Sequence, residues 1–489
     1  MRRAALALVA CAAIAHGETR PRYAGQVEAT LLGAPATLDP ALARSHAEAT
    51  VAELVFDTLY RLDGDGEAQP HLALGPPVYD EKRTTVRIAI RKGVRFHDGS
   101  ELTAQDVAAS LERTRATAPW VLASVAEVRA NGDAIELALR APTPDLELML
   151  ALPQTAVTKQ GKPPGDHPIG TGPFAVEAWD RARHRLKLRA FDDHFAGRPY
   201  VDLELRWYDT PDGEARNFET GGAQISVRGA SAFAGGEPTY RAAEVNSPAA
   251  VLAFVGFGQA HAAITGDRAF RRALDLAIAR GGLATIGSGE VVLPTRAPIP
   301  VEAGAPPLDA AARAGDLAGA TAQLADAARR VPQLQPGRIA TLAFEILVED
   351  TRPDDREIAE RVVRALDKLG IAATVSAVPA QQLRERVAAG SCDLWIGQLA
   401  EPLRETAAWY GAAFSAGNDD WATGQLAAGA LDPAAAARAF AERTPIVPLM
   451  FRAVRMWHRT DLRGIAFDAS GRPGYADMFF FGAPVRTRP

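Results

Sequence analysis

The chain has 489 residues, which is long enough to form more than one folded unit with a large core. Hydrophobic residues make up 47% of it and charged residues 23%, so a mainly disordered chain is excluded. The formal net charge is −5 and the Lys and Arg residues are scattered along the sequence. Nucleic acid is therefore not expected as a partner, because its phosphate backbone needs a clustered basic surface.

The first residues have the pattern of a secretory signal. Met1-Arg2-Arg3 is followed by an apolar run from Ala4 to Ala15, and small residues near Gly17 suit cleavage, which predicts a signal peptide over residues 1–17 and export to the periplasm. A second interpretation is that Leu8-Val9-Ala10-Cys11 is a lipobox, with Cys11 acylated and the chain anchored to the cell envelope. The apolar stretch before Cys11 is short and continues after it, which favours the first interpretation.

The remaining sequence offers little for a membrane span, a disulfide or a metal site. No later apolar run approaches the ~20 residues that a membrane-spanning helix needs. Without the signal, Cys392 is the only thiol. The histidines lie far apart and form no H-x-x-H or H-E-x-x-H pair, so no metal ion or other cofactor is expected. Among them are His97, His167, His184, His194, His261 and His458.

In chain order, the first clear unit is a strand, a turn and a capped helix. Residues 84–90 alternate Val86, Ile88 and Ile90 with polar or small residues, which predicts a half-buried strand. The turn at residues 97–100 follows, and the T-x-x-D pattern of Thr103 and Asp106 predicts a helix that begins there and extends to about residue 115.

The second half contains helix and strand patterns typical of an α/β lobe. Asp267 is expected to cap a helix whose apolar stripe runs from Phe270 to Ile278, with Gly281-Gly282 at its end. Residues 342–378 have the order strand, helix, strand, which predicts a βαβ unit. With a further strand at 393–399, the region 250–440 predicts a largely parallel sheet.

Several segments resemble bacterial extracellular solute-binding protein family five, which includes oligopeptide-, dipeptide- and nickel-binding proteins. The longest is IRKGVRFHDGSELTAQDVAASLERT at Ile90–Thr114, and PIGTGPFAVEAW at Pro168–Trp179 and PIVPLMF at Pro445–Phe451 follow in the family's order. FRRALDLAIARGGL is similar to the family's R-x-A-L-x-x-A-I-D-R helix, with Ala279 where an Asp is usual. Within the first motif, Gly93 and Gly99 are expected to serve turn geometry more than ligand contact.

This resemblance implies an α/β periplasmic-binding-protein fold of two lobes joined by hinge strands, with an extra subdomain on the N-terminal lobe. The N-terminal lobe is expected to comprise residues 18–48, 161–249 and 445–489, the inserted subdomain 49–160 and the C-terminal lobe 250–444. The implied function is to capture a small ligand, most simply a peptide, in the interlobe cleft and to present it to the permease of an ABC importer. The membrane would then be reached through the permease or an anchor at Cys11.

Five residues are candidates for ligand contact. Trp120 is placed where some members of the family have an aromatic residue in the cleft, although it could equally fill the core. Peptide-binding members have an acidic residue before an E-P pair, where this chain has Gln398 ahead of Glu401-Pro402, so recognition of a free peptide N-terminus is in question. Arg404, Trp409 and Tyr410 could line the cleft, or could belong to a solvated helix whose aromatic residues pack inward.

Other classes of function have less support from the sequence. An exported hydrolase would need a nucleophile motif such as G-x-S-x-G, and Gly287-Ser288-Gly289-Glu290 lacks its final glycine, so an enzyme is not expected. The alternatives that stay open are a binder of a metal chelate and a sensor or partner-binding module built on the same fold.

Overall fold

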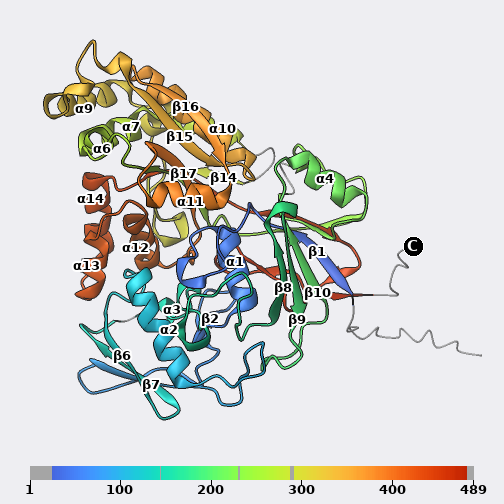
Figure 1. Cartoon of the computed structure of the whole chain (residues 1–489). Helices are drawn as coiled ribbons and strands as arrows, with labels where there is room; N and C mark the ends of the chain where they lie inside the picture. Colours follow the sequence, from blue (N-terminus) through green and yellow to red (C-terminus); the bar gives the residue numbers. More distant parts are fainter. Residues whose placement is uncertain (1–24, 144, 229–231, 287–290, 482–489) are drawn as a thin grey trace, which may run out of the picture.

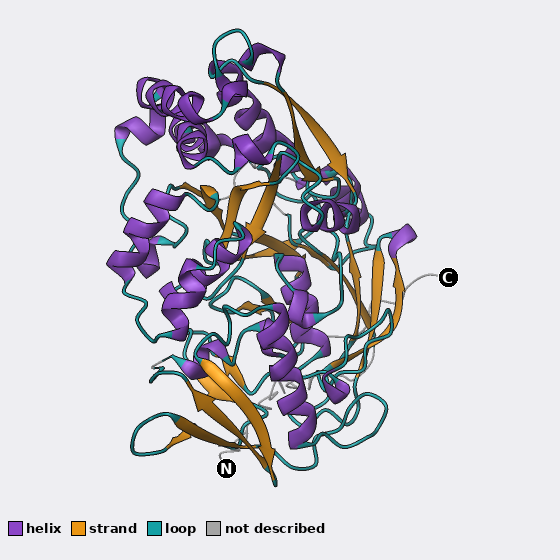
Figure 2. Ribbon diagram, turned by 60° about the vertical axis from the view of Figure 1, so that its left-hand side comes forward, coloured by secondary structure: helices purple, strands orange, loops and turns teal. Residues whose placement is uncertain are grey.

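The computed structural model describes residues 25–143, 145–228, 232–286 and 291–481. The signal peptide, the lipobox with Cys11 and the turn at 287–290 lie outside the described residues. Three larger sheets, each with its own helices, organise the described part of the chain (Figure 1). Figure 2 shows the same arrangement from the side, with most helices on the outside of the sheets. None of the helices in the described part combines the length and apolar character that a bilayer span requires.

The N-terminal lobe is built on a seven-stranded sheet in the order β12-β19-β11-β1-β10-β9-β8. Its strands are β1 (Gln26–Thr30), β8 (Phe174–Asp180), β9 (Arg185–Ala190), β10 (Asp202–Arg206), β11 (Ile225–Ser226), β12 (Ala242–Asn246) and β19 (Arg455–Arg459). Two helices accompany it, α1 (His46–Val55) and α4 (Pro211–Glu219). Strand β1 pairs in parallel with β10 and β11, and the other pairs are antiparallel. Three distant parts of the sequence thus meet in one sheet.

The subdomain has a four-stranded antiparallel sheet in the order β4-β5-β7-β6. Its elements are β2 (Tyr60–Leu62), β3 (Ala68–Pro70), β4 (Val78–Tyr79), β5 (Thr85–Ala89), α2 (Ala104–Thr117), β6 (Val125–Asn131), β7 (Ala134–Leu139) and α3 (Leu146–Met149). The capping box is confirmed, because Thr103 Oγ1 accepts from the Asp106 amide and Asp106 Oδ2 accepts from the Thr103 amide. The predicted strand is also confirmed, with Val86 and Ile88 buried on one face of β5.

The two motifs that resemble the family most strongly contact each other. Gly93 and Gly99 have φ of +74° and +82°, so the turns of the first motif need glycine. The His97 amide donates to Gly170 O at 2.9 Å, in the second motif. A Cβ on Gly170 would lie 1.9 Å from Val55 O, so only glycine fits there. Both motifs are explained by the packing of the subdomain on the N-terminal lobe, as expected of the first one.

The C-terminal lobe is built on a six-stranded sheet in the order β14-β18-β13-β17-β15-β16. Its strands are β13 (Val251–Phe257), β14 (Val292–Pro294), β15 (Ala343–Glu349), β16 (Ala372–Val378), β17 (Leu394–Leu399) and β18 (Val447–Arg452). Its helices are α6 (Ala262–Thr265), α7 (Arg268–Ala277), α8 (Ala310–Ala314), α9 (Leu317–Arg330), α10 (Pro353–Lys368), α11 (Ala380–Ala388), α12 (Thr406–Ala416), α13 (Trp421–Ala427) and α14 (Pro433–Arg443). The βαβ unit is confirmed as β15-α10-β16, and Asp267 caps α7 as predicted.

Two expectations for this lobe were wrong in detail. The sheet is mixed, since only β15 pairs in parallel, with β16 and β17, while β13 is antiparallel to both β17 and β18. Strand β13 brings the chain in from the N-terminal lobe and β18 returns it, so these neighbours must run in opposite directions. Helix α7 ends at Ala277, before Gly281-Gly282, because Arg280 turns inward and donates to Pro448 O and Thr295 O.

Two of the boundaries expected from the sequence differ from the division that the sheets and their cores show. Helix α1 contributes Ala47 and Val51 to the core of the N-terminal lobe, so a boundary at residue 49 would cut this helix. Strand β18 lies in the sheet of the C-terminal lobe, so that lobe continues past residue 445 to Arg452. Both elements connect one unit to the next, and their sequences show no Pro- or Gly-rich break at the change.

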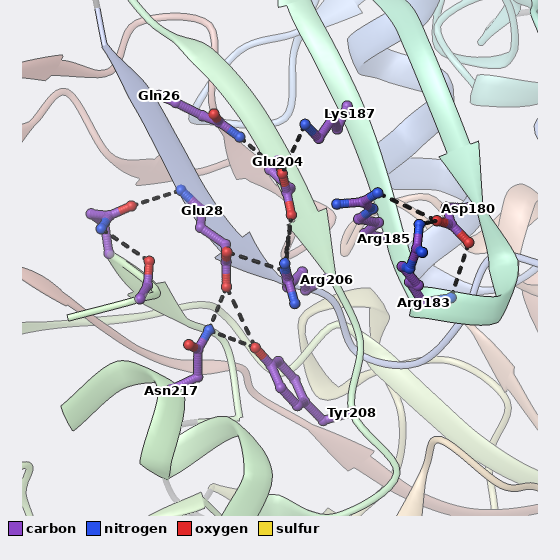
Figure 3. Close-up of polar contacts among 12 residues, drawn as sticks. Gln26, Glu28, Asp180, Arg183, Arg185, Lys187, Glu204, Arg206, Tyr208 and Asn217 are labelled. Carbon is purple, nitrogen blue, oxygen red and sulfur yellow. Dashed lines mark hydrogen bonds and ion pairs between the residues drawn. The ribbon is translucent and has the colours of Figure 1, made fainter. Parts of the chain in front are cut away.

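The polar face of the N-terminal sheet carries a network of charges, drawn in Figure 3. Glu28 of β1 and Glu204 of β10 are direct cross-strand neighbours, which would repel each other if nothing lay between them. Arg206 Nε lies 3.1 Å from Glu28 Oε2 and 2.9 Å from Glu204 Oε1, and Asn217 also donates to Glu28. These contacts tie strands and α4 together on the face opposite to buried Val27 and Ala29.

Candidate functional site

Two small cavities lie between the lobes, one on each side of the last residues of β17. Successive side chains of a strand point to opposite faces, so Gln398 and Leu399 face different cavities. We call these the Gln398 cavity and the Glu401 cavity. They are lined by residues of both lobes, and together they form the candidate ligand site.

The Glu401 cavity has a volume of about 40 Å³ and combines an aromatic residue with one acidic and one basic side chain. Trp120 comes from the turn after α2 in the subdomain, and Arg44 comes from the segment before α1. Leu399 and Glu401 belong to the C-terminal lobe. The remaining lining residues are Ala41, Leu42, Ala43, Thr117, Ala118, Gln154, Ala412, Ser415 and Ala416. The Trp120 ring lies against α12, where a Cβ on Gly411 would be 2.4 Å from its Cε3.

Glu401 is the most perturbed acidic group of this cavity. Its side chain is buried, and burial raises its pKa to about 8, an effect that the charge of Arg472 only partly opposes. Arg472 is already paired with Glu53 at 2.7 Å and also donates to Ala400 O at 3.3 Å. A cationic group that entered the cavity would favour the ionised form of Glu401 and pair with it. Arg44, on the opposite lobe, offers a guanidinium for an anionic group.

The Gln398 cavity is smaller, about 20 Å³, and is surrounded by charges that are already paired. Its lining residues are Leu32, Arg228, Val251, Arg352, Pro353, Asp354, Gln398, Arg452, Ala453 and Val454. Gln398 is 8% exposed, and its Oε1 atom is buried without a hydrogen-bond partner in the described part of the chain. An unsatisfied buried acceptor of this kind is a place where a ligand or water can donate a hydrogen bond.

An ion network at this end holds the two lobes together. Arg352 Nε lies 3.0 Å from Glu349 Oε2 and 2.9 Å from Asp355 Oδ2, and all three side chains are buried. Glu349 Oε1 in turn accepts from the Ala34 amide of the N-terminal lobe at 2.8 Å. From the same lobe, Arg228 donates to Thr351 O at 3.1 Å. Each of these contacts either joins the two lobes or holds in place a residue that makes such a contact. This is expected of a closed conformation.

The five residues predicted from the sequence do not lie together. Trp120 lines the Glu401 cavity and Gln398 lines the other one. Arg404 is exposed in the turn before α12. Trp409 is fully buried, donates from Nε1 to Pro402 O at 2.9 Å and packs against Phe451, while Tyr410 packs against Phe440. Trp409 and Tyr410 therefore lie on α12 with their side chains in a hydrophobic core. Their contact with a ligand stays a prediction, and their burial does not favour it.

The sequence did not point to Arg44 or single out Glu401. Glu401 was visible as half of the E-P pair, and its burial beside Leu399 is the feature that draws attention to it. Arg44 follows the TLDPALA segment without a motif of its own. Its position in the cavity depends on the packing of the N-terminal lobe against α11, where Arg384 pairs with Glu48 and donates to Leu42 O.

Comparison with known proteins identifies the family. Residues 67–421 match the family model described as "Bacterial extracellular solute-binding proteins, family 5 Middle". The chain belongs to this family. Family members are binding proteins, in agreement with the expectation from the sequence.

Among curated relatives, protein XP55 of Streptomyces lividans is 30% identical over 265 residues, which is 51% of this chain and 48% of that protein. The glutathione-binding protein GsiB of Salmonella choleraesuis is 31% identical over 207 residues, or 39% of this chain and 40% of that protein. The matched region thus spans less than half the length of these relatives.

Solved structures of low identity share the fold over nearly the whole chain. The oligopeptide-binding protein AppA of Bacillus subtilis, in complex with a nonapeptide, has a TM-score of 0.75 at 18% identity and covers 95% of this chain and 100% of its own. NikA of Staphylococcus aureus, in complex with Ni(L-His)2, has a TM-score of 0.75 at 16% identity and covers 93% and 99%. The predicted α/β two-lobed fold is confirmed by these likenesses.

Proposed function

We propose that this chain is the exported substrate-binding component of an ABC importer and that its ligand is a peptide or a peptide-like zwitterion. The observation that carries this proposal is the Glu401 cavity, where a buried carboxyl group and the guanidinium of Arg44 accompany Trp120 in the interlobe cleft. A peptide has an ammonium group, a carboxylate and apolar side chains, and the cavity offers a partner for each.

Binding and release would depend on movement of the lobes. A cavity of about 40 Å³ holds no more than a few water molecules, whereas small-molecule sites measure roughly 300–1,000 Å³. Ligand entry therefore requires the lobes to separate around the strands that cross between them, and closure around the ligand creates the surface that a permease recognises. The crossing segments are those that lead into β13 and out of β18.

In this proposal the recognition of the peptide N-terminus differs from the family pattern. Glu401 takes the role of the acidic residue that is replaced by Gln398, and Gln398 contributes a neutral hydrogen bond from the neighbouring cavity. Trp120 stacks on the ligand, and Arg404 meets the carboxylate of longer ligands at the edge of the cleft. The secretory pattern of residues 1–17 supports a periplasmic location, with the lipid-anchored form at Cys11 as the alternative.

The proposal is tested by thermal-shift measurements on the chain without residues 1–17, because a ligand that binds only the folded state raises Tm by mass action. Di-, tri- and tetrapeptides with free or acetylated N-termini and nickel–histidine chelates would be compared. We expect saturable stabilisation by free peptides, which acetylation of the N-terminus reduces. Glu401→Gln should remove this preference for a free N-terminus.

A matched control is Glu442→Gln, an exposed carboxylate on α14 of the same lobe, which should leave peptide binding unchanged. If only the chelates raise Tm, the proposed ligand is a metal chelate and not a peptide. A response to none of these solutes would overturn the transport proposal and favour a sensor or partner-binding role. An unchanged preference in Glu401→Gln would show that the amino group is recognised elsewhere.

A further inference from the structure

A third and larger cavity lies between the subdomain and the N-terminal lobe. Its volume is about 630 Å³, and among its lining residues are Asp57, His71 and His194. Asp57 comes directly after α1, His71 follows β3, and His194 lies in the loop between β9 and β10. One ligand atom of each residue lies within 4.8 Å of the others, so three distant segments converge on one point.

The hydrogen bonds of His194 leave one ring nitrogen with a free electron pair. Its Nδ1 lies 3.1 Å from Gly197 O, and because a carbonyl only accepts, Nδ1 carries the proton. In the neutral ring Nε2 is then an acceptor. This atom is buried, has no hydrogen-bond partner in the described residues and belongs to a side chain that is 6% exposed.

The atom that Nε2 of His194 faces is a carboxylate oxygen. Asp57 Oδ2 lies 3.6 Å away and already accepts from Thr171 Oγ1 at 2.8 Å. This distance is too long for a hydrogen bond, and with the neutral ring two electron-pair donors face each other across it. The distance of 3.6 Å between the two atoms is close to the value expected of two zinc ligands. Two ligand atoms that each lie about 2.0–2.1 Å from a tetrahedral zinc ion are about 3.3 Å apart.

The third group completes a set that suits a transition metal. His71 Nε2 donates to Asp57 Oδ1 at 2.7 Å, a proton that a metal ion would replace. The ring of Phe195 lies 4.9 Å from the rings of both His71 and His194 and holds their orientation. The bond from His194 Nδ1 to Gly197 O is the kind of outer contact that orients histidine ligands of metals.

We propose that Asp57, His71 and His194 form a binding site for a divalent transition-metal ion such as Zn²⁺, with an open coordination position toward the cavity. Two imidazoles and one carboxylate are common zinc ligands, and three protein ligands leave the fourth position to water or a solute. The bound ion joins the hairpin of the subdomain to the N-terminal lobe, so it also stabilises their contact. The site is independent of peptide capture between the lobes.

The test uses full-length mature chain without a histidine tag, stripped with a chelator and titrated with Zn²⁺ or Co²⁺. We expect one ion per chain, a rise in Tm and, with Co²⁺, visible absorption bands of low-coordinate cobalt. His71→Gln and His194→Gln should each weaken binding by more than the roughly 10- to 100-fold that changes to outer-shell partners cause. His261→Gln is the matched control, since His261 forms a pair with Asp393 at 2.6 Å in the other lobe.

Metal binding that survives both variants, or that His261→Gln lowers equally, would overturn the proposal, and so would the absence of a bound ion in the wild-type chain. Should a variant fold poorly, X-ray absorption of the zinc-loaded wild-type chain decides, because two imidazole ligands are required. Peptide-induced stabilisation of His194→Gln is measured in parallel. If peptides still stabilise this variant, a negative result for the metal site does not count against the proposed peptide site between the lobes.

Discussion

The two interlobe cavities differ in how their charges are satisfied. Around the Gln398 cavity the charged side chains are paired, as in the chain of contacts from Glu349 through Arg352 to Asp355. In the Glu401 cavity burial raises the pKa of the carboxyl group to about 8, and the charge of Arg472 opposes this in part. Removing one partner of a buried ion pair leaves an uncompensated charge, and ionising the buried carboxyl group of Glu401 costs free energy until a ligand supplies a cationic partner.

This difference suggests that the two ends of the cleft have different functions. The end near the hinge holds the lobes in register through contacts made inside the protein. At the other end, between Trp120 and Glu401, the side chains are available to interact with a ligand. Three substitutions can break or sharpen this comparison, and they are taken in order of the effect expected on stability.

The largest effect is expected from Arg352→Met. The substitution leaves Glu349 and Asp355 buried without their cation, and breaking a buried ion pair on one side costs about 3–5 kcal/mol. Urea unfolding of the ligand-free chain measures this loss. The control is Arg329→Met, whose pair with Asp326 is exposed, and which should change stability by less than about 1 kcal/mol. A loss below that value in Arg352→Met would show that the network does not hold the lobes.

The second prediction concerns Glu401 and pH. Because the pKa of Glu401 is raised from 4.5 to about 8 in the folded chain, the folded state keeps its proton where the unfolded state has lost it. Stability from this group is therefore present below about pH 4.5 and declines as pH rises toward 8. Glu401→Gln removes this decline and should be more stable than the wild type above neutral pH, by an amount that grows with pH.

Thermal melts of both ligand-free proteins from pH 5 to pH 8.5 measure the difference. It should be near zero at the acid end and grow with pH, since each unit of pKa shift corresponds to about 1.4 kcal/mol. A difference that does not depend on pH would mean that Glu401 is ionised in the empty cavity. The contrast between the two ends of the cleft would then be lost.

Local patterns in the sequence were enough for most of the elements. The box of Thr103 and Asp106 and the alternation of Val86 and Ile88 depend on nearby residues, and both are confirmed. The direction of β13 against β17 and β18 depends on how the chain passes between lobes, which no local pattern carries. The sheet predicted as largely parallel is mixed for this reason.

The candidate site was harder to predict, because its residues meet only through tertiary packing. Trp120 and Gln398 were predicted from their places in family motifs, and each lines a cavity, while their contact with a ligand stays a prediction. An aromatic residue in a cleft and one in a core have the same sequence signal, so the sequence could not predict that Trp409 and Tyr410 are buried in a core, to which the 5% exposed Trp120 also belongs. His71 and His194 lie on segments that sequence spacing cannot relate, so their convergence with Asp57 was invisible.

The smallest effect on stability is expected from Gly411→Ala, which tests whether the Trp120 end of the cleft opens. The added methyl group would lie 2.4 Å from Trp120 Cε3, so it would clash with the contact between the C-terminal lobe and the subdomain that the closed conformation makes. In an open conformation alanine suits the helix better than glycine by up to about 1 kcal/mol. Stability should therefore change little, while peptide affinity falls because overpacking opposes closure by about 1–3 kcal/mol, or roughly 5- to 150-fold.

The matched control is Gly424→Ala in α13, where a Cβ meets open space, and which should leave affinity unchanged. Small-angle scattering adds a direct view, since Gly411→Ala should keep a larger radius of gyration in the presence of peptide. If Gly411→Ala lowers the free energy of unfolding as much as it lowers affinity, Trp120 and α12 stay packed in every conformation. The opening would then have to occur at the hinge end, where Arg352→Met loosens the contacts between the lobes.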